Sequence, residues 1–81
     1  MDINVRIGDR IRELRKEKNL SQETLANIAE VDRTYMTKIE NGKKNVTVKL
    51  LEKIITVLEV DFATFFNVLK FENKDERADL N

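Results

Sequence analysis

The sequence contains no proline and only two glycines among its 81 residues. Proline and glycine most often break helices and form turns, so a chain nearly free of both favours helices throughout. A chain of this length supports one small domain with a modest core. The sequence therefore predicts a single all-α domain at residues 1–71, followed by a polar, frayed tail at residues 72–81.

Capping residues divide the predicted domain into five helices. Apolar residues at Ile7, Ile11 and Leu14 have the spacing of an amphipathic first helix, over residues 3–19. Ser, Asp and Thr side chains are favourable N-caps, and they stand before four more apolar segments. We expect these four helices at residues 22–30, 33–41, 48–58 and 62–71, after Ser21, Asp32, Thr47 and Asp61.

The second and third predicted helices are short and closely joined. About two turns of helix cannot stand alone and must pack on neighbours. In the third helix, Met36 and Ile39 are spaced to face a core, and Asn41-Gly42 supplies a left-handed stop. Two short helices across a tight turn, the second polar on one face, have helix-turn-helix geometry.

The polar side chains of the third helix are candidates for reading DNA. Arg33, in its first turn, can bond O6 and N7 of guanine together, the commonest specific contact, or remain a solvated or phosphate-bound arginine. Thr34 and Thr37 can contact thymine methyls or phosphates, or be ordinary surface threonines. Tyr35 and Lys38 lie on one side of the helix, although Tyr35 can instead be buried against the second helix.

The distribution of charge favours an anionic partner, although the formal net charge is zero. Residues 33–49 carry five basic side chains against Glu40 alone, whereas residues 59–81 carry six acidic and three basic ones. Local imbalance on solvated helices is the alternative explanation. If the charge does serve an anionic partner, Lys43, Lys44 and Lys49 contact DNA phosphates, which adds affinity without specificity.

Several functions are excluded by missing residue types. The chain has no cysteine and no histidine, so it lacks a disulfide, a Cys-based metal site and the usual general base. We expect no enzyme activity, no cofactor and no metal. No apolar run is long enough to cross a membrane and no signal peptide is evident, so we expect a soluble, cytoplasmic protein.

The last two predicted helices carry more apolar surface than a five-helix domain can cover. We expect the surplus to form a homodimer interface, although an apolar helix at the end of a small domain is usually core. Two-fold symmetry would place two recognition helices about 34–36 Å apart on a palindromic site. The predicted interface residues are Ile55, Phe62, Phe65, Phe66 and Leu69.

Three spaced motifs resemble the Cro/C1-type (XRE) helix-turn-helix family. They are Ile7-Gly8-x-x-Ile11-Arg12-x-Leu14-Arg15, Leu20-Ser21-Gln22-Glu23-x-Leu25-Ala26 and Ile39-Glu40-Asn41-Gly42. Within that family, further residues are similar to the controller proteins of restriction–modification systems: Asp32-Arg33-Thr34-Tyr35, Asn45-x-Thr47, Leu51, Ile54, Leu58-x-Val60 and Phe65-Phe66.

The resemblance implies a compact, lambda-repressor-like five-helix domain and a role for each matching residue. It implies that Gln22 meets a DNA phosphate and that Lys44 and Asn45 grip the backbone. It also implies that Arg15 and Glu40 form a pair tying the first helix to the third. The complete set of predicted base-reading residues is Arg33, Thr34, Tyr35 and Lys38, and the backbone set is Gln22, Thr37, Lys43, Lys44, Asn45 and Lys49.

The resemblance also implies a regulatory function. A controller protein of this kind binds palindromic operators as a homodimer and both activates and represses its own gene and the endonuclease gene. Two dimers on tandem sites, and contact with RNA polymerase, would belong to that function. The alternatives are a phage-type or stress repressor of the same fold, or a protein-binding module such as an antitoxin.

Two residues depart from the family pattern. Glu30 stands in the turn where the wider family often has glycine, so a positive φ there would cost about 1 kcal/mol. Lys44 stands where controller proteins often have arginine, and lysine lacks the planar fork that binds bidentately.

Overall fold

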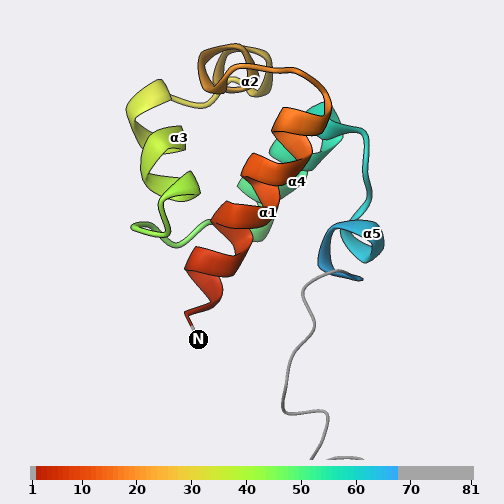
Figure 1. The fold of residues 1–81 in the computed structure, drawn as a ribbon. Coiled ribbons are helices and arrows are strands. Elements are labelled where there is room, and N and C mark those ends of the chain that lie inside the picture. Colours follow the sequence, from red (N-terminus) through yellow and green to blue (C-terminus); the bar gives the residue numbers. More distant parts are fainter. Residues whose placement is uncertain (1, 68–81) are drawn as a thin grey trace, which may run out of the picture.

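A computed structural model of the chain describes residues 2–67, and that range is all-helical (Figure 1). Its helices are α1 (Ile3–Glu17), α2 (Gln22–Ala29), α3 (Arg33–Glu40), α4 (Val48–Leu58) and α5 (Phe62–Asn67). The predicted five-helix fold is confirmed, and α4 has the predicted bounds. Residues 68–71 of the last predicted helix, and the predicted tail, lie outside the described residues. Within residues 2–67, no helix is both long and apolar enough to cross a bilayer.

Side-chain caps set where the helices begin. The four predicted caps, Ser21, Asp32, Thr47 and Asp61, each accept a hydrogen bond from the backbone N–H three residues later, at 2.8–3.1 Å. Asp2 caps α1 as well. Each cap satisfies a backbone donor that has no partner inside its helix, and this explains why the helix starts follow the sequence so closely.

Left-handed residues end the first four helices, beginning with Asn19, which follows α1 with φ at +59°. Gly42 follows α3 with φ at +72°, as the sequence predicts. Glu30 ends α2 with φ at +60°, and Glu59 ends α4 with φ at +63°. A side chain in this region costs about 1–2 kcal/mol. The turn between α2 and α3 therefore carries the backbone strain that glycine would avoid.

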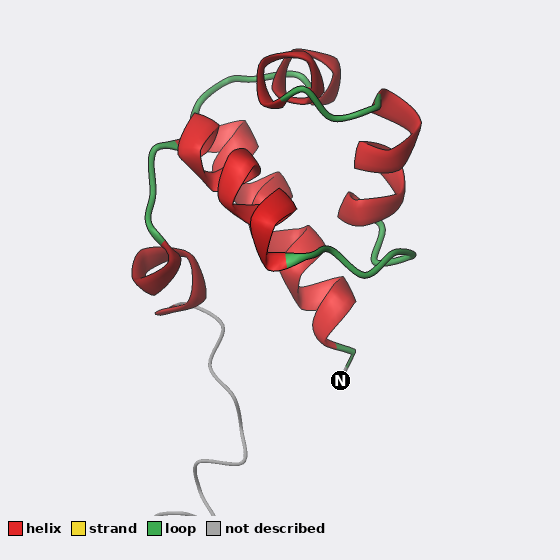
Figure 2. Cartoon of the chain, turned by 180° about the vertical axis from the view of Figure 1, so that it is seen from behind, coloured by secondary structure: helices red, strands yellow, loops and turns green. Residues whose placement is uncertain are grey.

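The helices are arranged around a central pair. Helices α1 and α4 lie side by side (Figures 1 and 2). Helix α2 lies across one end of this pair, α3 lies on one side of it, and α5 lies on the opposite side. Contacts between α1 and α3, between α2 and α4, and between α2 and α3 hold the helix-turn-helix pair on this support. Helix α3 is therefore fixed by two neighbours, α1 and α2.

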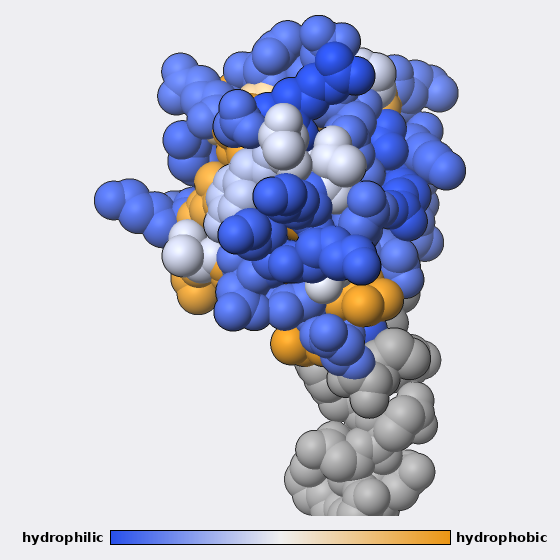
Figure 3. Space-filling model, turned by 90° about the vertical axis from the view of Figure 1, so that its left-hand side faces the viewer, coloured by the Kyte–Doolittle hydropathy of each residue, from blue (hydrophilic) through white to orange (hydrophobic). Residues whose placement is uncertain are grey.

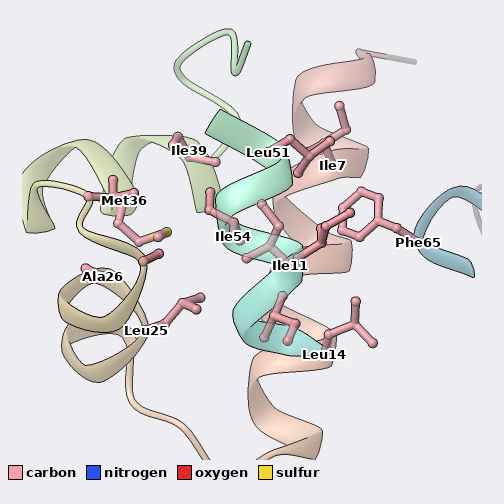
Figure 4. Packing of buried hydrophobic residues seen from close by; sticks show 14 residues of the cluster. Ile7, Ile11, Leu14, Leu25, Ala26, Met36, Ile39, Leu51, Ile54 and Phe65 are labelled. Carbon is pink, nitrogen blue, oxygen red and sulfur yellow. The ribbon is translucent and has the colours of Figure 1, made fainter. Parts of the chain in front are cut away.

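One apolar cluster fills the space between these helices (Figure 4). Ile11, Leu25, Met36 and Ile54 are fully buried, and Phe65 reaches from α5 into the same cluster. The members of the core are Ile7, Ile11, Leu14, Leu25, Ala26, Ala29, Val31, Met36, Ile39, Leu51, Ile54, Ile55, Leu58 and Phe65.

The core changes the prediction for the dimer interface. Phe65 and Ile55 were predicted to lie in the homodimer interface, but these residues are only 0% and 2% exposed in the protomer. Both belong to the apolar core of the protomer, so neither offers surface to a second copy. The apolar surface left for contact with a second copy is smaller than the sequence suggests, because Phe65 of α5 is buried in the core of the protomer.

Gly8 brings α1 and α3 together. A Cβ atom at this position would lie 2.5 Å from the backbone carbonyl oxygens of Ile39 and Glu40. Such a distance is too short for any side chain, so only glycine permits this approach. The glycine that weakens α1 as a helix thus allows the end of α3 to rest against it.

Candidate nucleic-acid interface

The outward face of α3 is polar, and its inward face is apolar. Arg33, Thr34 and Lys38 are exposed, Tyr35 and Thr37 are half-buried, and the remaining three residues of the helix are buried. The side of the molecule that bears α3 is hydrophilic over most of its area (Figure 3). The exposed residues occupy the first turn of α3 and the outer side of its second turn.

Arg33 is held only loosely. Its side chain is 67% exposed, and Nη1 lies 3.8 Å from a carboxylate oxygen of Glu23 on α2. An exposed ion pair at this distance contributes little to stability. The guanidinium can therefore leave Glu23 for a stronger acceptor at small cost.

Tyr35 and Asn45 contact one another. The hydroxyl of Tyr35 donates to the backbone carbonyl of Asn45 at 3.3 Å, and the Asn45 side chain accepts from Asn4 of α1 at 2.7 Å. The loop after α3 is thus attached to both α3 and α1. Lys43 and Lys44 extend from this loop with exposed side chains. Tyr35 is neither fully exposed nor packed away, and its hydroxyl bonds the loop.

A buried carboxylate lies beneath the outward face. Glu40 is fully buried, and its two oxygens accept hydrogen bonds from Nε and Nη2 of Arg15 at 2.8 and 3.1 Å. Gln22 Nε2 donates to the same carboxylate at 3.2 Å. A buried charge is tolerated only when it is paired and hydrogen-bonded, and here α1 and α2 both supply donors. This network joins three helices at the end of α3.

Gln22 continues the network to the surface of α3. Its Oε1 accepts a hydrogen bond from the hydroxyl of Thr37 at 2.6 Å, while the nitrogen of the same amide bonds Glu40. Thr37 Oγ1 also lies 3.1 Å from the backbone carbonyl of Arg33. Two residues predicted to contact DNA backbone, Gln22 and Thr37, are thus bonded to each other.

Two arginines of α1 that were not predicted to have a role hold the helices on either side of it. Arg12 Nη2 donates to the carbonyl of Glu40 and to the side chain of Asn41, at 2.9 and 3.0 Å, and so caps the end of α3. Arg10 is buried and donates to the carbonyls of Thr64 and Phe65 in α5, at 3.2 and 3.0 Å.

A sequence signal for Arg10 does exist. It lies three residues after Ile7 and four before Leu14, on the apolar side of α1. An arginine in that register needs acceptors inside the fold, and the carbonyls at the end of a short helix can supply them. The sequence alone does not reveal that α5 provides these carbonyls.

A half-buried aromatic pair on α5, Phe62 and Phe66, packs against the apolar core. The rings of Phe62 and Phe66 lie 6.5 Å apart and are nearly parallel, with 9° between their planes, and both side chains are half-buried. Val48, at the start of α4, is 74% exposed. Leu69, the last predicted interface residue, lies outside the described residues.

Other kinds of site find little support in the described part of the chain. Residues 2–67 contain no group of three or more potential metal-ligating side chains of the His, Cys, Asp and Glu types. A shallow hollow of about 530 Å³ lies between α1, α2 and α4, and it shares no residue with α3. Ile28, which is 58% exposed, forms part of its apolar lining.

Comparison with known proteins identifies similar chains. A helix-turn-helix family model (HTH_3) matches residues 11–65. The control protein C.MunI of Mycoplasma sp is 44% identical over 72 residues, which cover 88% of this chain and 97% of that protein.

Solved structures of restriction–modification controller proteins are similar to this chain as well. The restriction–modification controller protein C.AhdI of Aeromonas hydrophila superposes with a TM-score of 0.77 at 39% identity, covering 82% of this chain and all of that one. The controller protein C.Esp1396I, solved as a tetramer with its natural 35-base-pair operator, gives a TM-score of 0.78 at 38% identity, covering 85% and 91%.

Proposed function

Because this chain belongs to the Cro/C1-type helix-turn-helix family of DNA-binding transcriptional regulators, we propose that it is the controller protein of a restriction–modification system. In this proposal it binds palindromic operators as a homodimer and both activates and represses its own gene and the endonuclease gene. Similarity over nearly the whole length of a control protein supports the proposal. The predicted domain at residues 1–71 contains the family match.

The observation that carries the proposal is the way α3 is presented. Its first turn exposes Arg33 and Thr34, and its far end is fixed through Glu40 to α1 and α2. The N-terminal residues of a recognition helix contact base edges in the major groove. In that position, Arg33 bonds O6 and N7 of a guanine, with Thr34, Tyr35 and Lys38 beside it, and bidentate geometry discriminates by about 1–3 kcal/mol.

Backbone contacts come from the residues that surround this reading face. Lys43, Lys44 and Lys49 are exposed on the loop after α3 and on the first turn of α4. Each phosphate that such a lysine neutralises makes binding more salt-dependent. Gln22 uses one N–H for Glu40, and its amide nitrogen carries a second that can reach a phosphate. Asn45 is held close to Tyr35 by its backbone carbonyl.

A homodimer would form through the part of α5 that the core leaves exposed. The stacked pair of Phe62 and Phe66 supplies an apolar surface, and Arg10 holds the helix that carries it. Two-fold symmetry then places two copies of α3 about one turn of DNA apart. Two dimers on tandem sites, one of them close to RNA polymerase, would let activation at low concentration change to repression at high concentration.

Binding to the DNA upstream of the protein's own gene tests this proposal. Fluorescence anisotropy at fixed salt compares that duplex with a shuffled duplex of the same composition. Wild-type protein should prefer the natural duplex by at least about 10³-fold, the lower range for specific regulators. Arg33→Ala should lose most of this preference and keep its binding to shuffled DNA.

Lys53→Ala is the matched control, because Lys53 is an exposed cation of α4 that lines a hollow beside Ala29 and Glu30. It should bind both duplexes as the wild type does. Equal binding of the two duplexes by wild-type protein would refute the proposal. An unbound duplex together with a monomeric protein would favour a protein-binding module instead.

A further inference from the structure

We propose that Thr37 reads base identity in the major groove by accepting a hydrogen bond from the exocyclic amino group of an adenine or a cytosine. This assignment rests on the proposed function, since Thr37 meets DNA only if α3 enters the groove. It differs from the expectation that Thr37 contacts the phosphate backbone. One chain of hydrogen bonds runs from the buried Glu40 through Gln22 to Thr37.

The Glu40 carboxylate fixes the orientation of the Gln22 amide. Both of its oxygens face the Arg15 guanidinium, and a carboxylate in this position only accepts hydrogen bonds. The amide group of Gln22 lies 3.2 Å from one of these oxygens. Only the NH₂ end of the amide can face it, because an amide oxygen there would be repelled. Gln22 Oε1 must therefore point away from Glu40, toward Thr37.

The orientation of Gln22 determines where the Thr37 proton goes. Thr37 Oγ1 lies 2.6 Å from Gln22 Oε1 and 3.1 Å from the backbone carbonyl of Arg33. Both neighbours are acceptors, and a hydroxyl has a single proton to donate. Whichever neighbour receives it, the proton is used inside the protein. Thr37 is left with an acceptor lone pair and a methyl group for anything outside.

Thr37 lies within the exposed arc of α3. Successive helical residues are about 100° apart, so Thr37 projects about 40° from Arg33 and about 60° from Thr34. Arg33 and Thr34 are exposed, and Thr37 is half-buried between them. A base that meets the first turn of α3 is therefore within reach of the Thr37 side chain as well.

An acceptor on α3 selects its partner by chemistry. Phosphate oxygens carry no proton in DNA, so they offer nothing to a hydroxyl whose own proton is already used. The hydrogen-bond donors on base edges in the major groove are the N6 amino group of adenine and the N4 amino group of cytosine. Contact between the Thr37 methyl and a thymine methyl is the competing possibility, and the following test separates the two.

The test selects binding sites from a randomised duplex with the full chain and three variants. Thr37→Val removes the hydroxyl and keeps a methyl group and the shape, whereas Thr37→Ser keeps the hydroxyl. Thr56→Val is the control, because Thr56 makes a similar bond to a carbonyl four residues earlier, on α4. At one position per half-site, wild-type protein, Thr37→Ser and Thr56→Val should prefer adenine or cytosine, and Thr37→Val should not.

A base analogue then identifies the bonded group. Purine replaces the selected adenine, or 2-pyrimidinone the selected cytosine, and each lacks the amino group. Wild-type affinity should fall by up to about tenfold, the equivalent of about 1.4 kcal/mol for one hydrogen bond. Thr37→Val should already show that loss and should lose nothing further with the analogue.

Three results would overturn the assignment while leaving the proposed function intact. The first is an equal loss of affinity in Thr37→Val for all sequences, as a phosphate contact requires. The second is a preference for thymine that both wild-type protein and Thr37→Val show. The third is an equal loss of affinity in both proteins when the base analogue is introduced. If wild-type protein enriches no sequence at all, the proposed function itself is refuted, and this assignment with it.

Discussion

Replacing Glu40 with glutamine should severely destabilise the protein. The substitution keeps the shape of the side chain but removes the charge that two N–H groups of Arg15 donate to. Glu40 is fully buried, and the Arg15 side chain is only 13% exposed. The variant therefore leaves the Arg15 guanidinium beneath the surface without a counter-charge. One of its two N–H donors then faces the NH₂ group of the new glutamine, and the other faces an amide oxygen, which is a weaker acceptor than a carboxylate.

The size of the effect follows from this burial. Removing one partner of a buried ion pair costs about 3–5 kcal/mol. A protein of this length has a total stability of about 4–12 kcal/mol, at about 0.05–0.15 kcal/mol per residue. Glu40→Gln should therefore lose about a quarter or more of the free energy of unfolding. If the total stability is about 4 kcal/mol, a loss of this size leaves the variant close to, or beyond, its unfolding midpoint at room temperature.

Urea unfolding followed by circular dichroism measures this loss. The control replaces the pair by apolar residues, as Arg15→Met with Glu40→Leu, which should recover most of the stability because neither member of the buried pair is left as an unpaired charge. Arg12, whose Nε lies 3.6 Å from the same carboxylate, is 34% exposed and keeps its bonds to the backbone carbonyl of residue 40 and to Asn41. This double variant should still lose operator preference, since Gln22 and Thr37 lose their fixed orientation. A loss below about 1 kcal/mol in Glu40→Gln would refute the reasoning that this network fixes α3.

Three further predictions concern the turns and α5. Glu30→Gly should raise the free energy of unfolding by about 1 kcal/mol in the same urea assay, because glycine adopts the left-handed conformation of this turn without strain; an unchanged midpoint would contradict this. Phe65→Ala should cost about 3–5 kcal/mol of protomer stability. Phe66 is half-buried and packs edge-on against Phe65, so Phe66→Ala should cost less protomer stability and should mainly raise the dissociation constant of the proposed dimer in sedimentation equilibrium. Equal effects of the two substitutions on both quantities would refute the division between core and proposed interface. The hydrogen bond from the backbone N–H of Thr64 holds the pKa of Asp61 below its ordinary value of 3.8. This cap therefore stabilises α5 above that pH, and its contribution is lost as the pH falls through the lowered pKa. The NMR resonance of the Thr64 amide should shift as Asp61 titrates, and a resonance that does not move would argue against the cap.

Much of the fold follows from local signals in the sequence. Ser21, Asp32, Thr47 and Asp61 mark helix starts because a cap needs only the three residues after it. The left-handed turn at Gly42 after α3 is equally local, since this conformation depends on one residue. These features require no knowledge of what packs against them.

Features that depend on distant residues could not be predicted in the same way. The sequence offers Phe62, Phe65 and Phe66 as equivalent apolar side chains, yet only Phe65 enters the core. That choice depends on how α5 docks, and Arg10 is hydrogen-bonded to α5 from 55 positions earlier in the chain. The bond between Gln22 and Thr37 likewise exists only because Glu40 lies between α1 and α2.

The central claim is that two copies of α3, related by two-fold symmetry, read two half-sites on one face of DNA. Affinity measured as a function of half-site spacing tests it most directly, with the half-site recovered by selection. The account predicts two protomers per duplex and the tightest binding at a spacing of about 10–10.5 base pairs. Insertion of about half a turn between the half-sites should weaken binding to the level of a single half-site. Affinity that does not depend on spacing, or one protomer bound at saturation, would contradict the account.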